Sequence, residues 1–216
     1  MRGLLLVLVM LPGAVFAGPW LRDEGAGFLS FSSTIEEAKE PGAADTFTTL
    51  YGEYGLRPKL TLGVDMGVDE LGFYKAIAFA VMPVTQLSSE RKISLEFGVG
   101  TTDGAPVMRP GFAIGHGVSF NGMSGWMSFE TRAEIQIWDA DLAISTDVTF
   151  GLNATKQTKW IFQLQQGGAM SDPDYLRFAP SVVVQTGNGR HLELGMTAGV
   201  QNASAVGLKI GLWHEF

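Results

Sequence analysis

Apolar and polar residues alternate along most of the chain from about Gly25 onward. In the segment KLTLGVDMGVD (59–69) one face carries Leu60, Leu62, Val64, Met66 and Val68, and the other carries Thr61, Gly63, Asp65, Gly67 and Asp69. The same period of two recurs in the segments 92–100, 126–137, 141–152 and 191–201. No stretch keeps a period of 3.6 residues, so the pattern predicts β-strands and no long helix.

Short segments rich in turn-forming residues separate these runs, among them TTDGAP (101–106), NGMSG (121–125) and GNGR (187–190). Asn-Gly and Asp-Gly pairs are typical of tight hairpins. Counting the runs gives about twelve strands of about ten to twelve residues, the spacing of transmembrane barrels, with ten strands as the next option. Residues 18–216 are therefore predicted to form a single all-β domain, an up-and-down antiparallel transmembrane β-barrel.

Two features of the sequence complicate this pattern. The segment FYKAIAFAVMPV (73–84) has alanines at alternate positions, so its two faces cannot be assigned. Pro110 and Pro180 lie inside predicted strands, where each removes one donor from the hydrogen-bonded ladder. We expect bulges or strand ends to accommodate the two prolines.

The alternation alone does not tell whether the apolar face points inward, as in a soluble lipocalin-like barrel, or outward, as in an outer-membrane barrel. Glycine is frequent on the polar face, and glycine weakens a strand unless space is short, as it is inside a narrow barrel. Lysine is sparse within the strands. Large aromatic residues such as Tyr54, Phe150, Trp160 and Phe216 stand near strand ends, where interfacial girdles lie. These features favour an apolar face toward lipid and a polar lumen.

The first 17 residues, MRGLLLVLVMLPGAVFA, have the plan of a cleaved secretory signal peptide, with Arg2 followed by a short apolar run and small residues before Gly18. The apolar run is too short to cross a bilayer of about 30 Å as a helix. Lys and Arg number 15, so 14 remain after Arg2 is removed, against 22 acidic residues, and this balance argues against nucleic-acid binding. The absence of cysteine excludes thiolate catalysis and disulfides.

The last residues, VGLKIGLWHEF (206–216), continue the alternation to a terminal phenylalanine. This ending resembles the C-terminal assembly signal of Gram-negative outer-membrane barrel proteins, carried here by Leu208, Ile210, Leu212 and Phe216. His214 departs from that pattern, which more often has Tyr or an apolar residue there. The resemblance implies export to the cell outer membrane, with outer-membrane lipid and the barrel assembly machinery as partners.

A second, shorter resemblance lies in LYGEYGLRPKLTLGVD (50–65). This hairpin is similar to that of outer-membrane proteins grouped with the meta-pathway phenol-degradation family. Members of that family are suspected of carrying hydrophobic compounds.

If the polar face is internal, charged side chains from many strands meet in the lumen. Arg132 lies between Glu130 and Glu134 on one face of its strand, a spacing of two residues that predicts salt bridges to both. Rings of charged side chains set ion selectivity in pores, although the same charges can pair and close a narrow interior. The residues predicted to line the lumen are Glu96, Arg109, Glu130, Arg132, Glu134, Asp147, Arg177, Glu193 and Lys209.

No enzymatic centre or cofactor site is predicted. A nucleophilic serine needs a histidine within hydrogen-bond reach, yet His116 and Ser119 are three residues apart in a predicted strand and so face opposite sides. His191 and His214 lie near strand ends and are interpreted as interfacial residues. Neither a compact cluster of metal ligands nor a phosphate-binding glycine loop followed by a helix is present, so no metal and no cofactor are expected.

The sequence therefore predicts a porin-like outer-membrane barrel that allows passive transport of ions or small solutes through a narrow polar lumen. Two alternatives remain open: a structural barrel whose lumen is closed, and a soluble exported β-barrel that binds an apolar ligand inside. The sequence does not identify the solute or the oligomeric state.

Overall fold

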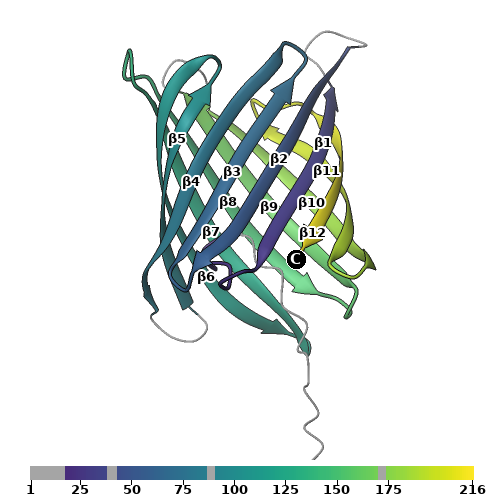
Figure 1. Ribbon diagram of the computed structural model, residues 1–216. Helices are drawn as coiled ribbons and strands as arrows, with labels where there is room; N and C mark the ends of the chain where they lie inside the picture. The colour runs from purple at the N-terminus through teal and green to yellow at the C-terminus, as the bar shows by residue number, and fades with distance from the viewer. Residues whose placement is uncertain (1–17, 38–42, 87–90, 170–173) are drawn as a thin grey trace, which may run out of the picture.

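The computed structural model describes residues 18–37, 43–86, 91–169 and 174–216, and these form an antiparallel barrel (Figure 1). Its strands are β1 (Gly27–Glu37), β2 (Ala44–Arg57), β3 (Leu60–Asp69), β4 (Gly72–Gln86), β5 (Arg91–Thr102), β6 (Ala105–Phe120), β7 (Met123–Gln136), β8 (Leu142–Asn153), β9 (Thr158–Ala169), β10 (Tyr175–Gly187), β11 (Arg190–Gln201) and β12 (Val206–Glu215). The predicted signal peptide lies outside the described residues.

Each strand pairs antiparallel with its neighbours in the chain, and β12 pairs with β1 to close the barrel. The closing register runs from Phe28 opposite Glu215 to Glu36 opposite Gly207. Both ends of the barrel chain lie at one rim, where the Gly27 amide donates to the Phe216 carbonyl over 2.7 Å. The prediction of an all-β, up-and-down barrel of twelve strands is confirmed. Among the described residues no helix is long and apolar enough to span a membrane.

The apolar face of the wall points outward and the polar face points inward. Large apolar side chains such as Leu194 and Ile210 are 55% and 54% exposed, whereas the polar residues Thr61 and Glu193 are 1% and 3% exposed. A soluble barrel with an apolar interior requires the opposite arrangement. The hypothesis of a soluble barrel that binds an apolar ligand inside is therefore wrong.

Strand β4 is apolar on both faces, which explains why its alternation is blurred in the sequence. Ile77, Phe79 and Val81 are buried inside the barrel, and the small alanines occupy the positions between them. Glycine on β3 and β5 makes room for these inward side chains. A methyl group on Gly63 would collide with the ring of Phe79, and a methyl group on Gly98 would lie 2.9 Å from Cγ2 of Ile77.

The two prolines are accommodated by local gaps in strand pairing. On the β7 side of β6, Met108 pairs with Ile135 and Gly111 with Arg132, so the register is unchanged while Arg109 and Pro110 pair with no β7 residue. Ala179 and Pro180 make the same kind of gap on the β11 side of β10. The expectation of bulges or strand ends at these positions was wrong, because leaving two consecutive residue pairs out of the ladder already removes the need for the missing N–H donor.

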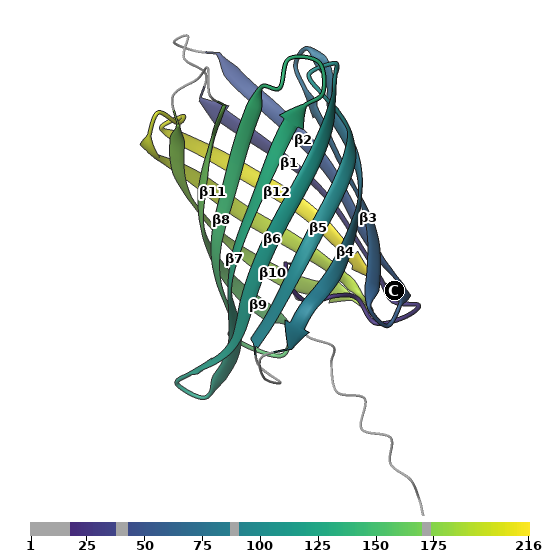
Figure 2. The same ribbon diagram turned by 90° about the vertical axis from the view of Figure 1, so that its left-hand side faces the viewer.

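The turns follow the sequence prediction closely. Asp103-Gly104 and Asn121-Gly122 all have positive φ angles, of 49°, 73°, 48° and 78°, as a type I′ hairpin requires. The hairpin between β6 and β7 extends beyond the neighbouring turns at its end of the barrel (Figure 2). The Asn-Gly and Asp-Gly pairs thus fix the hairpin connections of the meander at these two places.

Candidate functional site

The nine residues predicted to line the lumen all carry their side chains on the inner face of the barrel, and most of them make ion pairs there. We call one group of them, with two further residues, the large cluster. Its members come from five neighbouring strands, β3 to β7: Asp65, Lys75, Glu96, Arg109, Glu130, Arg132 and Glu134.

Arg109 on β6 is the most buried member of the large cluster, with 1% of its surface exposed. Its guanidinium donates to Asp65 over 2.6 Å and to Glu96 over 2.8 Å, and it lies 3.9 Å from Glu134. The ring of Phe79 lies beneath it, 5.3 Å from its central carbon. Asp65 also accepts a hydrogen bond from Lys75 over 2.9 Å. A buried cation is thus compensated by several carboxylates and an aromatic face.

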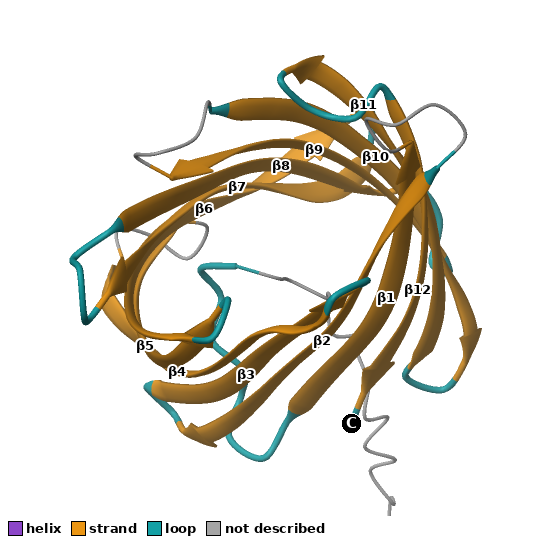
Figure 3. Ribbon diagram, turned by 90° about the horizontal axis from the view of Figure 1, so that it is seen from above, coloured by secondary structure: helices purple, strands orange, loops and turns teal. Residues whose placement is uncertain are grey.

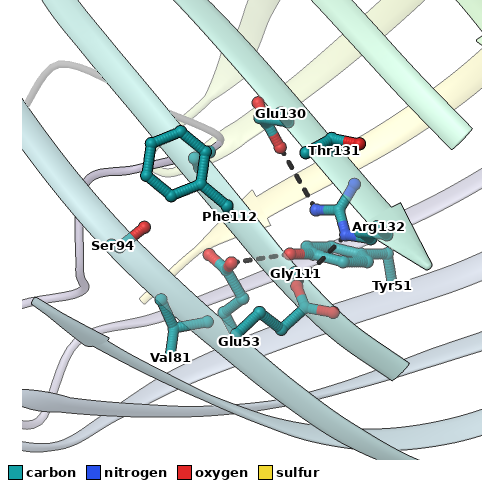
Figure 4. Close-up of a pocket in the computed structure, with 12 residues that line it drawn as sticks. Tyr51, Glu53, Val81, Ser94, Gly111, Phe112, Glu130, Thr131 and Arg132 are labelled. Atoms are coloured by element: carbon teal, nitrogen blue, oxygen red, sulfur yellow. Dashed lines mark hydrogen bonds and ion pairs between the residues drawn. The ribbon is translucent and has the colours of Figure 1, made fainter. Parts of the chain in front are cut away.

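Arg132 on β7 connects two carboxylates of the large cluster (Figure 4). It donates to Glu130 on its own strand and to Glu96 on β5, each over 3.1 Å. Strand β6 lies between β5 and β7, and the contact across it depends on Gly111. A methyl group at Gly111 would lie 3.1 Å from Cβ of Glu96 and 3.2 Å from Cγ of Arg132.

The predicted pairing of Arg132 with both neighbours on its strand is half correct. Glu130 is its partner, but Glu134 is not. Glu134 accepts a hydrogen bond from Thr102 over 2.9 Å and approaches Arg109 instead. The physical reason is that Arg132 extends across Gly111 toward Glu96, away from Glu134.

A second set of ion pairs lies on the opposite wall. Arg177 on β10 donates to Glu36 on β1 over 2.8 Å, across the two intervening strands β11 and β12. Lys209 on β12 pairs with Glu193 on β11 at 3.1 Å. Glycine again provides the room, because a methyl group on Gly207 would lie 2.7 Å from Cγ of Glu36. Gly111 and Gly207 on the polar face therefore accommodate long charged neighbours, as Gly63 and Gly98 accommodate large apolar ones.

Asp147 on β8 differs from the other predicted lumen residues. It stands opposite Glu130 on β7 and opposite Gln165 on β9. Within the described parts of the chain, no cationic side chain lies within 4.0 Å of its carboxylate. Asp147 is thus a half-buried carboxylate that lacks a direct ion pair of the kind its neighbour Glu130 has.

The charged lumen side chains of the large cluster, the opposite wall and Asp147 together carry a net negative charge. The large cluster holds four carboxylates and three cations, and the pairs of Arg177 with Glu36 and of Lys209 with Glu193 are balanced. Asp147 adds a carboxylate without an ion pair. The excess of carboxylates among these described residues favours a cation over an anion at this level of the barrel.

One segment that lies inside the barrel is not predicted by the alternation of the sequence. Residues 18–26 precede β1 and fold into the lumen, and we call this segment the N-terminal strap (Figure 3). Pro19 is fully buried. A methyl group on Gly115, on the inner face of β6, would collide with the rings of Pro19 and Trp20. The strap has no alternating pattern, so its sequence gave no sign of this position.

Arg22 anchors the N-terminal strap to the barrel wall. Its side chain donates to Glu53 on β2 over 2.6 Å, and its backbone amide donates to the Thr61 hydroxyl on β3 over 2.9 Å. The guanidinium also lies 4.7 Å from the centre of the Phe28 ring. Arg22 with Glu53 adds one further balanced ion pair, so the charge of the lumen stays negative.

The histidines do not assemble a catalytic or metal centre. His116 and Ser119 alternate to opposite faces of β6, as predicted. His191 lies 3.9 Å from Glu215, and His214 is 3.3 Å from the Gly189 carbonyl. Among the described residues no group of three or more His, Asp or Glu side chains could hold a metal ion.

No protein-family model matches the chain, and no curated protein matches it. Solved structures do match. The NanC porin aligns with a TM-score of 0.65 at 7% identity, covering 86% of this chain and 98% of its own. The KdgM porin aligns with a TM-score of 0.61 at 7% identity, covering 88% and 99%. The COG4313 outer membrane channel from Pseudomonas putida F1 aligns with a TM-score of 0.59 at 10% identity, covering 94% and 100%.

These likenesses span nearly the whole length of each matched structure, so this chain has the same fold as outer-membrane porins and channels. Identities of 7% to 10% carry no information about individual lumen residues. The function of the lumen therefore depends on the side chains that line it in this chain.

Proposed function

We propose that this protein is an outer-membrane β-barrel channel that lets small solutes and ions pass passively and that prefers cations. The single observation that carries the proposal is a lumen with excess carboxylate, enclosed by a wall whose outer face is apolar. Charged side chains that line a narrow pore select ions by sign.

The outer face supports a place in a membrane. Exposed apolar side chains such as Phe97, Val148 and Leu208 cover strands around the barrel, and burying them in lipid is favourable. Because the strand ladder is closed, it has no edge strand whose backbone N–H and C=O groups would be unpaired in lipid. Export through a cleaved signal peptide, with Phe216 recognised by the barrel assembly machinery, belongs to this proposal. In its favour, Leu208, Ile210, Leu212 and Phe216 are all exposed on the outer face.

The sign of the lumen charge bears on the class of solute. One of the matched structures is the KdgM porin in complex with disordered oligogalacturonate, a polymer of an acidic sugar. The carboxylate excess around Glu134 and Asp147 makes such a polyanion a poor solute for this chain. The resemblance of residues 50–65 to the meta-pathway phenol-degradation family gains no support, since no family model matches. We therefore propose small cationic or neutral solutes.

A closed, structural barrel is the second candidate, and the filling of the lumen favours it. Arg109 is almost completely buried, and the N-terminal strap occupies part of the interior. Ion pairs such as Arg177 with Glu36 lay long side chains across the inner face of two strands. If these groups leave no continuous water path, the charges serve stability only.

Swelling of liposomes that contain the purified protein tests both candidates. Isosmotic lysine hydrochloride and sodium glutamate give a cation and an anion of similar size. The channel proposal expects faster swelling with lysine than with glutamate, and a reduced difference for Asp147→Asn. Swelling no faster than in protein-free liposomes would contradict the channel and leave the closed barrel. A preference for glutamate would contradict the proposed charge selectivity.

A further inference from the structure

The first described residue of the N-terminal strap reaches the large cluster. A methyl group on Gly18 would collide with the Glu130 carboxylate, with the carboxyl carbon at 2.9 Å. Gly18, Tyr51, Glu53, Glu96, Glu130 and Arg132 all line one pocket between the strap and the barrel wall (Figure 4). The backbone of residue 18 thus lies against a carboxylate deep inside the barrel.

Around Gly18 the carboxylates Glu53, Glu96 and Glu130 have Arg22, Arg109 and Arg132 as partners, and Asp147 adds a carboxylate in excess. Glu130 accepts hydrogen bonds from Arg132 and from the Ser128 hydroxyl, each over 3.1 Å. Arg132 also donates a hydrogen bond to Glu96, so its charge is shared between two carboxylates. Asp147, which has no direct cationic partner among the described residues, stands directly opposite Glu130. Like charges on directly opposite residues of neighbouring strands destabilise a sheet. A further cation at this place would relieve that repulsion.

The sequence predicts that signal peptidase cuts between Ala17 and Gly18, which would give residue 18 a free α-amino group. We propose that this cut places the α-ammonium group of Gly18 against the Glu130 carboxylate, and that the resulting ion pair holds the N-terminal strap inside the lumen. The Glu130 site is thus a binding site for the chain's own new N-terminus. The proposal rests on the predicted cleavage and is independent of whether the lumen conducts.

The identity of the first residues fits this arrangement. Glycine at position 18 has no side chain, and the collision described above shows that any larger residue would displace the carboxylate. Pro19 and Trp20 fill the space over Gly115. Arg22 binds Glu53 farther along the strap, so the segment is held at two carboxylates. The α-ammonium group supplies three N–H donors to a group that accepts at two oxygens.

Amine reactivity in the folded protein tests this proposal. The exported protein is purified from the membrane fraction, and its intact mass establishes where the chain begins. It is then treated with an acetylating N-hydroxysuccinimide ester, and acetylation of Gly18 is followed by mass spectrometry. The same protein unfolded by heat in detergent gives the reference rate. We expect the α-amine to react at least about tenfold more slowly in the folded protein, because it is reached only after local opening.

Two variants distinguish whether the Gly18 amine is protected by an ion pair or by burial alone. Glu130→Gln removes the charge and is expected to restore most of the reference rate. The control is Glu36→Gln, which changes a carboxylate on the opposite wall and should leave Gly18 protected. If Glu130→Gln does not fold, a chain that begins one residue earlier, at Ala17, replaces it. That chain moves the ammonium group away from Glu130 and should likewise lose protection.

Three results would overturn the proposal: a mature chain that begins elsewhere, a wild-type α-amine that reacts at the reference rate, or protection that neither altered chain reduces. None of these results bears on liposome swelling. Failure of the N-terminal site and failure of the channel are therefore distinguishable.

Discussion

Replacing Arg109 tests whether the buried ion pairs hold the barrel together. The Arg109→Met variant keeps most of the side-chain length but leaves Asp65, Glu96 and Glu134 without their shared guanidinium. The side chain of Arg109 is only 2% exposed, so water does not replace the lost contacts. We expect a marked loss in the free energy of unfolding.

The magnitude follows from what each carboxylate retains. Removing one partner of a buried ion pair costs about 3 to 5 kcal/mol. Asp65 keeps Lys75 and Glu96 keeps Arg132, so the loss is expected at the lower end, about 3 kcal/mol. The matched control is Arg177→Met, because Arg177 has one carboxylate partner, Glu36, among the described residues and its side chain is 30% exposed. Pairs that water reaches contribute about 1 kcal/mol or less.

The assay is reversible urea unfolding in lipid vesicles, followed by tryptophan fluorescence. The double variant Arg109→Met with Glu134→Gln removes the carboxylate for which the described residues offer no second cation, so it should recover at least about 1 kcal/mol of the loss. Equal losses for Arg109→Met and Arg177→Met would refute the reasoning. So would a double variant no more stable than Arg109→Met, since the carboxylates would then not be energetically coupled to Arg109.

Three further predictions concern the wall, the lumen and the chain end. Val148→Arg introduces a charge on the outward face near the middle of β8 and should lower the free energy of unfolding in vesicles by about 2 to 4 kcal/mol. The control, Ser145→Arg on the inner face, should lower it by less than about 1 kcal/mol. Similar losses for the two variants would contradict the assigned orientation. Asp147→Asn removes the carboxylate without an ion pair and should move the reversal potential of single channels toward zero in a salt gradient; an unchanged potential would remove Asp147 from the selectivity site. Deleting Phe216 should lower the amount of folded protein in the outer membrane more than the yield of refolding in detergent; equal losses would mean that Phe216 serves folding alone.

Much of the fold could be predicted because the wall of a membrane barrel has lipid on one side and a polar lumen on the other. Successive residues of a strand face these two sides in turn, which gives the period of two. Alternation and turn chemistry identified the strands, including hairpins at Asp103-Gly104 and Asn121-Gly122. Strand β4 was not assignable, since Ile77 and Phe79 are apolar residues that point inward. An apolar lumen position breaks the rule on which the prediction depends.

The candidate site was predictable only to the level of which residues face inward. Alternation placed Glu96, Arg109 and Arg132 on the polar face, but the partners depend on contacts across strands. The contact of Arg132 with Glu96 requires Gly111 on the strand between them, and the sequence shows no such link. Lys75 was missed with the rest of β4. The N-terminal strap was missed because a coil that binds through Arg22 has no period to detect.

The central claim is that a negatively charged lumen conducts small cations across an outer-membrane barrel. The most direct test is the reversal potential of the mature protein in a planar lipid bilayer under a gradient of potassium chloride. The account predicts discrete channel openings whose current reverses at a potential of the sign set by potassium permeation. An absence of channel openings, or a reversal potential of the sign set by chloride, would contradict it.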